Sequence, residues 1–394
     1  LDSPLPLGEG PGVRASAAPQ IVYTADIFDA EALSLCVDRR IHVNCGSADM
    51  IDQLGCAVAE GDSPIFVGTK IGTVPLGGRQ ITLRINPGFG HGHSRKTNTG
   101  GDQSKHGIWH TQIGECLERA ARHGLRVTGL HMHIGSGTDL AHLSEVAAAM
   151  EKAAGGVGPQ IVSISAGGGL PVPYRDGESR IDLAAYFAVW DAARKRLEDR
   201  FGHRVRLEVE PGRYLVAESG YLVAEIRAVK RQGEHWFYLL DAGFNNLARP
   251  ILYGAYHPMS IARAAGDCPN FRGHHAKHGR ENGTVPFGDA AAGPTMREVI
   301  VGGPLCESGD IFTQSEGGYV LPRCLPEADV GDFVVIECAG AYGFVMGSNY
   351  NGRPLAAEVL IQDGQACQIR SRQTFEDLVR GETIPGREGL GIRD

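Results

Sequence analysis

Hydrophobic and polar positions follow two different periods along this chain, and the pattern changes near residue 222. Before that point, short apolar runs alternate with segments whose apolar residues recur every three or four positions. The first pattern is typical of buried strands and the second of amphipathic helices. Six runs are expected to be strands, at 20–26, 41–46, 81–87, 127–135, 161–168 and 205–212. The helical spacing is clearest at 29–39, 113–124, 140–153 and 183–200.

Repeated strand–helix units predict a parallel sheet covered by helices, over residues 20–222. The α/β barrel is the fold we expect, although a closed barrel of this kind has eight strands and the pattern supplies six. Functional side chains of such a barrel lie at the carboxyl ends of its strands. After residue 222 the pattern becomes strands and turns, which predicts a separate, mostly antiparallel β domain over 223–394.

Three stretches fit neither pattern. Residues 1–19 are rich in Pro, Gly and Ala without periodicity, so we expect them to be disordered. Residues 57–80 and 269–294 are rich in Gly and Pro and share the tetrapeptide GTVP, so both are predicted to be surface insertions. The second holds His274, His275 and His278, but no Cys or acidic partner stands at ligand spacing. We therefore predict exposed loop histidines and no metal site.

Composition narrows the class of protein. The net charge of −8 over 394 residues argues against general nucleic-acid binding, and no apolar run is long enough to span a membrane. The nine cysteines are scattered without CxxC or zinc spacing, which predicts reduced thiols in a cytoplasm. No basic patch precedes an apolar core at the amino terminus, so no signal peptide is expected.

The stretch GLHMHIGSGTDL, residues 129–140, places two histidines on one side of an extended segment and then turns on glycine. An aromatic ring beside a turn with exposed backbone N–H groups suggests a flat, phosphorylated cofactor. The alternative is a buried histidine followed by an ordinary turn.

Two further strand ends carry candidate chemistry. In SAGGGLPVPY, Gly167, Gly168 and Gly169 would let the backbone approach an anion, although a flexible turn would look the same. In LEVEPGRYLV, Glu210 is either a structural partner of an arginine or the carboxylate that holds a heteroaromatic ring nitrogen protonated.

A third candidate lies in the second domain. GGPLCESGDIF, residues 302–312, brings Cys306 together with Glu307, Ser308 and Asp310. A thiol beside carboxylates should have a raised pKa, which suits a proton donor better than a nucleophile.

In this order and spacing, HMHIGSG, SAGGGLPVPY, EPGR, CESGD and GAYG resemble the fold-type III pyridoxal phosphate decarboxylases. These enzymes combine an alanine-racemase-like barrel with a β domain. Within the group the chain is most similar to the diaminopimelate decarboxylases, through the stretches that begin at RINPGFGHGH, DAGFNNLARP and SNYNGRPL. The resemblance implies decarboxylation of meso-2,6-diaminopimelate to L-lysine in a cytoplasmic homodimer with shared active sites.

The resemblance also implies roles for matching residues. His133 would stack on the cofactor ring, Glu210 would bind the pyridine nitrogen, and Cys306 would donate a proton, while His131 would only pack in the barrel. The phosphate would be held by Ser136, Gly167, Gly168, Gly169 and Gly212. Cofactor or substrate would be held by Arg213, Arg249, Tyr253, Glu307, Ser308 and Tyr342. Two arginines suit a substrate with a second carboxylate.

One expected feature is missing from the printed sequence. The family attaches its cofactor to a lysine in a YAxKA-like segment on the first barrel strand, and no such segment occurs here. We therefore expect a barrel that lacks its first two strands, in an amino-terminally truncated chain. The alternatives are a catalytically inactive homologue and a related decarboxylase of basic amino acids.

Overall fold

The computed structural model describes residues 21–61, 78–90, 98–135, 140–264 and 294–383. The chain divides into two compact units. Unit 1 runs to Leu170 and includes Asp182–Pro211, while unit 2 comprises Pro171–Ile181 and everything from Gly212 onward.

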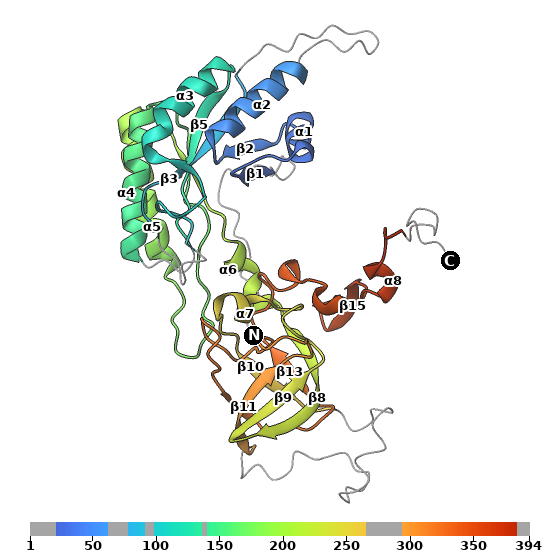
Figure 1. The fold of residues 1–394 in the computed structure, drawn as a ribbon. Helices are drawn as coiled ribbons and strands as arrows, with labels where there is room; N and C mark the ends of the chain where they lie inside the picture. Colours follow the sequence, from blue (N-terminus) through green and yellow to red (C-terminus); the bar gives the residue numbers. More distant parts are fainter. Residues whose placement is uncertain (1–20, 62–77, 91–97, 136–139, 265–293, 384–394) are drawn as a thin grey trace, which may run out of the picture. The chain divides into compact units, whose positions relative to one another are not determined.

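Unit 1 is built on a parallel sheet (Figure 1). Its strands are β1 (Val22–Ala25), β2 (His42–Cys45), β3 (Gln80–Asn86), β4 (Ile108–Trp109), β5 (Arg126–His131), β6 (Ser163–Ser165) and β7 (Arg206–Glu208). The strands pair in the order β1-β2-β3-β5-β6-β7, and short β4 pairs with β3 outside this path. Every pairing is parallel, so all the carboxyl ends meet at one edge of the sheet.

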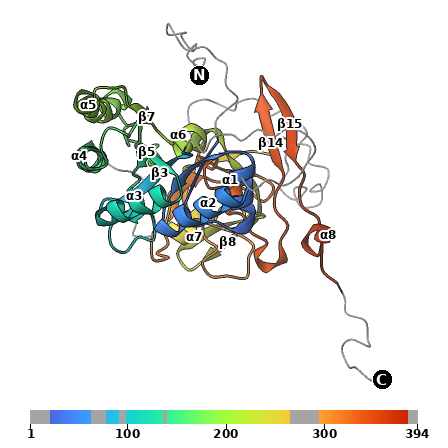
Figure 2. The ribbon, with the colours of Figure 1, turned by 90° about the horizontal axis from the view of Figure 1, so that it is seen from above.

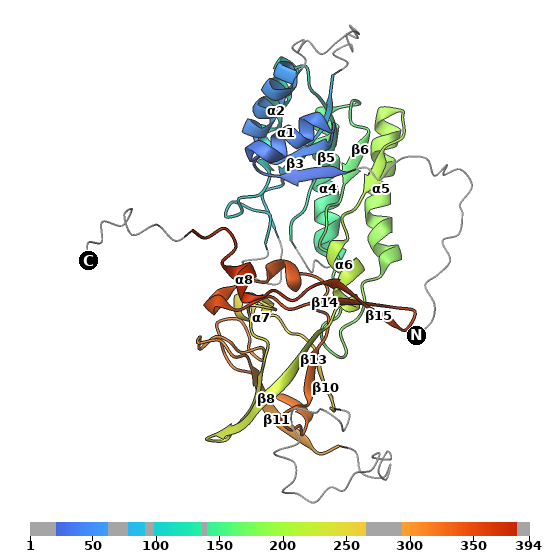
Figure 3. The same ribbon diagram turned by 90° about the vertical axis from the view of Figure 1, so that its right-hand side faces the viewer.

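Helices follow the strands in turn. They are α1 (Ala30–Asp38), α2 (Ala48–Gly61), α3 (Ile113–Arg122), α4 (Leu140–Val157) and α5 (Leu183–Phe201), with a 3-10 turn η2 (His110–Gln112) before α3. Because parallel crossovers are right-handed and the strands are ordered sequentially, these helices lie on the same face of the sheet. Figures 2 and 3 show α4 and α5 packed side by side on that face.

Local chemistry explains where these helices begin and end. Asp29 and Asp182 cap α1 and α5 by accepting backbone N–H groups of the first turn. Gly202 ends α5 with a left-handed φ of 75°, a conformation that glycine adopts at little cost.

All six predicted barrel strands are present, and with the short β4, which was not predicted, they form a parallel half-barrel sheet, consistent with the expected α/β barrel. The strands are shorter than predicted, because the polar strand-end residues lie in the loops that follow them. Helix α2 was not predicted, and it extends to Gly61, so residues 57–61 are helical instead of part of a surface insertion. Residues 62–77 of that stretch lie outside the described residues, as do the predicted insertion from 269 to 293 and the amino-terminal 1–19.

Unit 2 contains a six-stranded sheet in the order β10-β13-β8-β9-β11-β12. Its strands are β8 (Leu222–Gln232), β9 (His235–Leu240), β10 (Met259–Ala262), β11 (Met296–Gly302), β12 (Arg323–Pro326) and β13 (Phe333–Ile336). Only β9 and β11 pair in parallel, which confirms the mostly antiparallel expectation. A buried cluster that includes Ile226, Tyr238, Val301, Phe312 and Val334 forms the core.

Several shorter elements complete unit 2. The antiparallel hairpin β14 (Glu358–Gln362) and β15 (Gln365–Arg370) forms its own two-stranded sheet, visible in Figure 2. The helices are α6 (Gly212–Val216), α7 (Arg249–Tyr253) and α8 (Phe375–Leu378), and the 3-10 turns are η3 (Ala217–Ser219), η5 (Phe344–Met346) and η6 (Tyr350–Gly352).

The boundary between the units differs from the predicted one at residue 222. Val172, Ala217 and Ala341 form a buried cluster, against which Tyr174 and Tyr214 pack. This contact joins residues 171–181 and the segment after Pro211 to unit 2. No helix in the described part of the chain is long and apolar enough to cross a membrane.

Candidate functional site

The glycine run after β6 lies very close to the ends of β5 and β7. A Cβ atom at Gly167 would lie 2.6 Å from Cβ of His133, and one at Gly168 would lie 2.7 Å from the carbonyl oxygen of Glu210. At Gly169 it would lie 2.3 Å from the carbonyl oxygen of Gly135. Gly167 and Gly169 also have positive φ values, of 64° and 99°. Only glycine fits this run, because any side chain would collide with neighbouring backbone or with His133.

His133 follows β5 and is held as a neutral ring. Burial is the main cause that lowers its pKa from 6.5 to about 4, with smaller effects of His131 and Arg84 in the same direction. Its Cε1 atom lies 3.3 Å from the place where a Cβ of Gly169 would be. An uncharged aromatic ring therefore stands directly beside the glycine run.

Glu210 follows β7, and Pro211 comes next in the chain. Its Oε2 atom lies 3.1 Å from Nε2 of His131, and this hydrogen bond is the largest cause that lowers the pKa of Glu210. Burial opposes the shift, while the nearby His131 and Arg84 support it. The side chain is still 43% exposed, so an ionised carboxylate remains open to a ligand.

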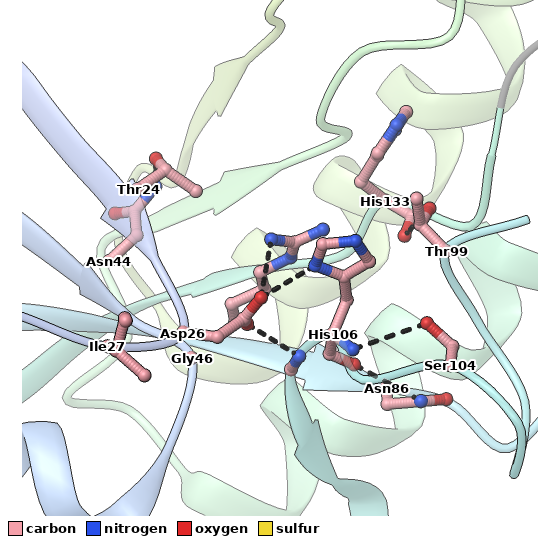
Figure 4. Close-up of polar contacts among 12 residues, drawn as sticks. Thr24, Asp26, Ile27, Asn44, Gly46, Asn86, Thr99, Ser104, His106 and His133 are labelled. Carbon is pink, nitrogen blue, oxygen red and sulfur yellow. Dashed lines mark hydrogen bonds and ion pairs between the residues drawn. The ribbon is translucent and has the colours of Figure 1, made fainter. Parts of the chain in front are cut away.

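A second polar cluster lies at the ends of β1 and β3 (Figure 4). Asp26 accepts hydrogen bonds from Nδ1 of His106, at 2.6 Å, and from the backbone N–H of Gly107, at 2.8 Å. Arg84 approaches the same carboxylate at 3.7 Å. Asn86 accepts the N–H of Gly101 and donates to the carbonyl of His106, so side chains of both strands fix the loop 101–107.

This cluster borders a cavity of about 590 Å³ at the carboxyl edge of the sheet. Its lining includes Thr24, Asp26, Arg84, Lys105, His106 and Gln112. Lys105, from the loop that Asp26 and Asn86 fix, is thus one of the cations beside this cavity.

Unit 2 holds the two predicted arginines around one aromatic ring. Arg213 donates from Nη1 to the hydroxyl of Tyr174 at 3.1 Å, and the guanidinium of Arg249 lies 4.7 Å from the centre of the Tyr174 ring. Arg249 is buried, and its Nη1 donates to Nε2 of His257 at 2.9 Å. His257 in turn donates from Nδ1 to the carbonyl of Glu337, at 2.9 Å.

Because His257 accepts from Arg249, it must be neutral. Burial and the charge of Arg249 lower its pKa to about 4. The Arg213 guanidinium also lies 5.1 Å from the ring centre of Tyr342, whose positive φ of 58° turns the GAYG segment. The sequence pattern predicted these arginines and Tyr342 but missed Tyr174 and His257.

Cys306 lies on an exposed loop of unit 2. Its backbone N–H donates to the side-chain carbonyl of Asn351 at 2.9 Å, and Tyr350 donates to Glu307 at 3.3 Å. Asp310 is different from its neighbours, since it is buried and accepts N–H groups of Phe244 and Leu305. We assign Asp310 a structural role, which leaves the exposed Cys306, Glu307 and Ser308 for a ligand.

The structure thus brings together His133, Gly167, Gly168, Gly169 and Glu210 in unit 1. In unit 2 it brings together Arg213, Arg249 and Tyr342, while Tyr253 ends α7, which Arg249 begins. Gly212 begins α6, and Ser136 lies outside the described residues. His131 is buried as expected, but it also bonds Glu210, so packing is not its only role. Among the described residues, no group of three or more His, Cys, Asp or Glu could hold a metal ion.

Unit 1 fits a pyridoxal phosphate enzyme. An ionised carboxylate suits a protonated pyridine nitrogen, a neutral ring suits stacking, and a side-chain-free backbone turn suits a phosphate. The sequence model of the pyridoxal binding domain of pyridoxal-dependent decarboxylases matches residues 12–217.

Individual relatives agree. Diaminopimelate decarboxylase of Escherichia coli is 48% identical over 92% of this chain and 77% of its own length. The enzyme of Streptomyces coelicolor is 47% identical over 93% of this chain and 74% of its own. The chain belongs to the diaminopimelate decarboxylase family of pyridoxal-dependent decarboxylases.

Solved structures show the same relationship. One crystal structure of diaminopimelate decarboxylase aligns with a TM-score of 0.78 at 46% identity, covering 91% of this chain and 76% of that one. The Helicobacter pylori enzyme, complexed with L-lysine, aligns with a TM-score of 0.72 at 26% identity, covering 91% and 78%.

The neutral histidines make stability depend on pH. An unfolded His133 takes up a proton near pH 6.5, whereas the folded one does so only near pH 4. Between these values the unfolded state binds more protons, so the free energy of unfolding should fall as the pH is lowered from 6.5 to 4. His133→Phe should remove part of this pH dependence, measured as the free energy of unfolding in urea at a series of pH values, and His257 should maintain the rest. The exposed His110→Phe serves as control. An unchanged slope in His133→Phe would contradict the assignment.

Proposed function

We propose that this chain acts in the pyridoxal phosphate-dependent decarboxylation of meso-2,6-diaminopimelate, which yields L-lysine and CO₂. The assignment of the substrate rests on one observation, the pair Arg213 and Arg249 around Tyr174. Each guanidinium can bind a carboxylate with two hydrogen bonds. A substrate that keeps a second carboxylate after decarboxylation uses such a pair, whereas ornithine has a cation at its far end. Relatives at 48% and 47% identity carry the name of this activity.

When bound, pyridoxal phosphate supplies a ring that accepts the electron pair left on the α-carbon as CO₂ departs. Glu210 would accept the N–H of the pyridine and keep that nitrogen positive. His133 would pack on the ring face, and its neutral state avoids repulsion with the positive ring. The backbone of Gly167, Gly168 and Gly169 would hold the phosphate.

Unit 2 would handle the substrate and the proton. Arg213 and Arg249 would fix the distal carboxylate, with Tyr253 and Tyr342 beside them. The Cys306 thiol would give its proton to the α-carbon and regain one from water, while Glu307 and Ser308 line its loop. We propose that Cys306 serves the site of a second copy, in a cytoplasmic homodimer, as the family resemblance implies.

Two alternatives remain testable. A catalytically inactive homologue would release no CO₂ from any of these amino acids. A related decarboxylase of basic amino acids would share the pyridoxal site and differ in the arginine pair.

The substitution Arg249→Ala tests whether diaminopimelate is the substrate. The chain is fused behind a lysine-bearing first-strand segment of the family, and CO₂ release from diaminopimelate, ornithine and lysine is compared. The loss of a charge-assisted contact should lower kcat/KM for diaminopimelate roughly ten- to a hundredfold. Arg263→Ala, which breaks an ion pair with Asp332, is the control. Equal turnover of ornithine and diaminopimelate by the unmutated fusion would overturn the assignment.

Cys306→Ala tests the proton donor. We expect slower product formation with unchanged cofactor binding, whereas Cys324→Ala, at another exposed cysteine, should have little effect. Mixing Cys306→Ala with a variant of the fused cofactor lysine should restore part of the activity, because one site of a mixed dimer is then intact. No recovery after proven subunit exchange would argue against shared sites.

Borohydride reduction tests whether any lysine of this chain binds the cofactor covalently. None of the seven lysines of the printed sequence stands in a YAxKA-like segment, so pyridoxal phosphate should bind without a covalent bond. After reduction and denaturation, mass spectrometry should find no pyridoxyl group on the chain. A modified lysine would show that another residue has taken this role.

A further inference from the structure

The carboxylate of Glu210 has a separate hydrogen-bond partner at each oxygen. Oε2 pairs with Nε2 of His131 at 3.1 Å, and Oε1 pairs with Oγ1 of Thr24 at 3.4 Å. Thr24 lies on β1 and Glu210 follows β7, the first and last strands of the sheet order. The curvature of the half-barrel therefore lets its two outermost strands meet through one carboxylate.

The direction of the Thr24 hydrogen bond follows from its second partner. Asn44, buried on β2, donates from Nδ2 to Oγ1 of Thr24 at 2.9 Å, and the two side chains lie together in Figure 4. A hydroxyl has a single proton. Because the oxygen of Thr24 already accepts from Asn44, its proton is available for Oε1 of Glu210. Asn44 thus orients Thr24 as a donor.

His131 is committed to Glu210 in a similar way. Its side chain is only 1% exposed, and its Nδ1 atom has no hydrogen-bond partner among the described residues. Among the described residues, the bond to Glu210 is therefore the one hydrogen bond of this buried ring. Burying Nδ1 of His131 without a hydrogen-bond partner costs free energy. An apolar side chain would fill the same space without this cost, so the histidine is explained by its bond to Glu210.

We propose that Thr24 and His131 are positioning residues that hold Glu210 as an ionised carboxylate, with Asn44 fixing Thr24. A carboxylate has about four lone-pair sites, so two remain for a ring N–H donor on the 43% exposed side. This inference rests on the proposed function, because the donor would be the pyridine nitrogen of the cofactor. It adds three residues that the sequence motifs did not mark for this task.

The first measurement needs no cofactor. Titration of the Glu210 carboxyl carbon by NMR, assigned with Glu210→Gln, reports its ionisation in the whole chain. Thr24→Val and His131→Phe should each move the midpoint upward, because each removes a donor to the charged form. Thr24→Ser and His131→Gln, which keep a donor, should move it back toward the original value. His133 and Arg84, the other charged or titratable groups that act on Glu210, stay unchanged in all four variants.

Thr82→Val is the matched control. Thr82 is a buried threonine on β3 that pairs with Nε2 of His42 at 2.8 Å, in the same sheet, and it makes no hydrogen bond to Glu210 in the described part of the chain. It should leave the Glu210 midpoint in place. If Thr24→Val and His131→Phe, folded as judged by thermal unfolding, also leave it in place, the positioning role is overturned.

The second measurement is the Kd of pyridoxal phosphate, followed by its absorbance and fluorescence. Loss of one hydrogen bond to a charged group should weaken binding roughly tenfold in His131→Phe, with recovery in His131→Gln. Unchanged affinity in both donor-deleting variants would overturn the inference. If the unmutated chain binds no pyridoxal phosphate, the proposed function fails, and the NMR titration still decides separately whether Thr24 and His131 hold Glu210.

Discussion

The hydrogen bonds to the Glu210 carboxylate are the constraint on which the proposed cofactor site of unit 1 depends. They connect β1, β5 and the end of β7, so they require the sheet to curve until its outermost strands approach. A flat sheet of the same strands would leave the carboxylate without Thr24. The curvature of the half-barrel and the ionisation of one side chain are therefore parts of a single arrangement.

Close backbone approach makes the second contribution. At Gly167, Gly168 and Gly169 any Cβ would meet His133, the carbonyl of Glu210 or the carbonyl of Gly135. The space that a side chain would take is left to the ends of β5 and β7 and to a ligand. Burial then keeps His133 neutral, so the ring offers a face without adding charge beside Arg84.

In unit 2 the main constraint is the burial of positively charged guanidinium groups. Arg249 is directed by a neutral His257 and packs on Tyr174, which also accepts a hydrogen bond from Arg213. Aromatic faces and a neutral acceptor hold the guanidinium groups without neutralising their charge. The positive charge is therefore retained, which the proposed substrate with its distal carboxylate requires.

The sequence by itself determined the six parallel strands, the β domain and the family, because strand periodicity and glycine-rich motifs are local properties of the chain. It also marked His133, Glu210 and the arginine pair. Only the tertiary structure decided that His131 bonds Glu210 and that Thr24 and Asn44 take part. These residues are ordinary strand positions in the sequence, and Thr24 lies 186 positions from the carboxylate that it contacts. Their roles exist only because the curved sheet brings the side chains within hydrogen-bond distance.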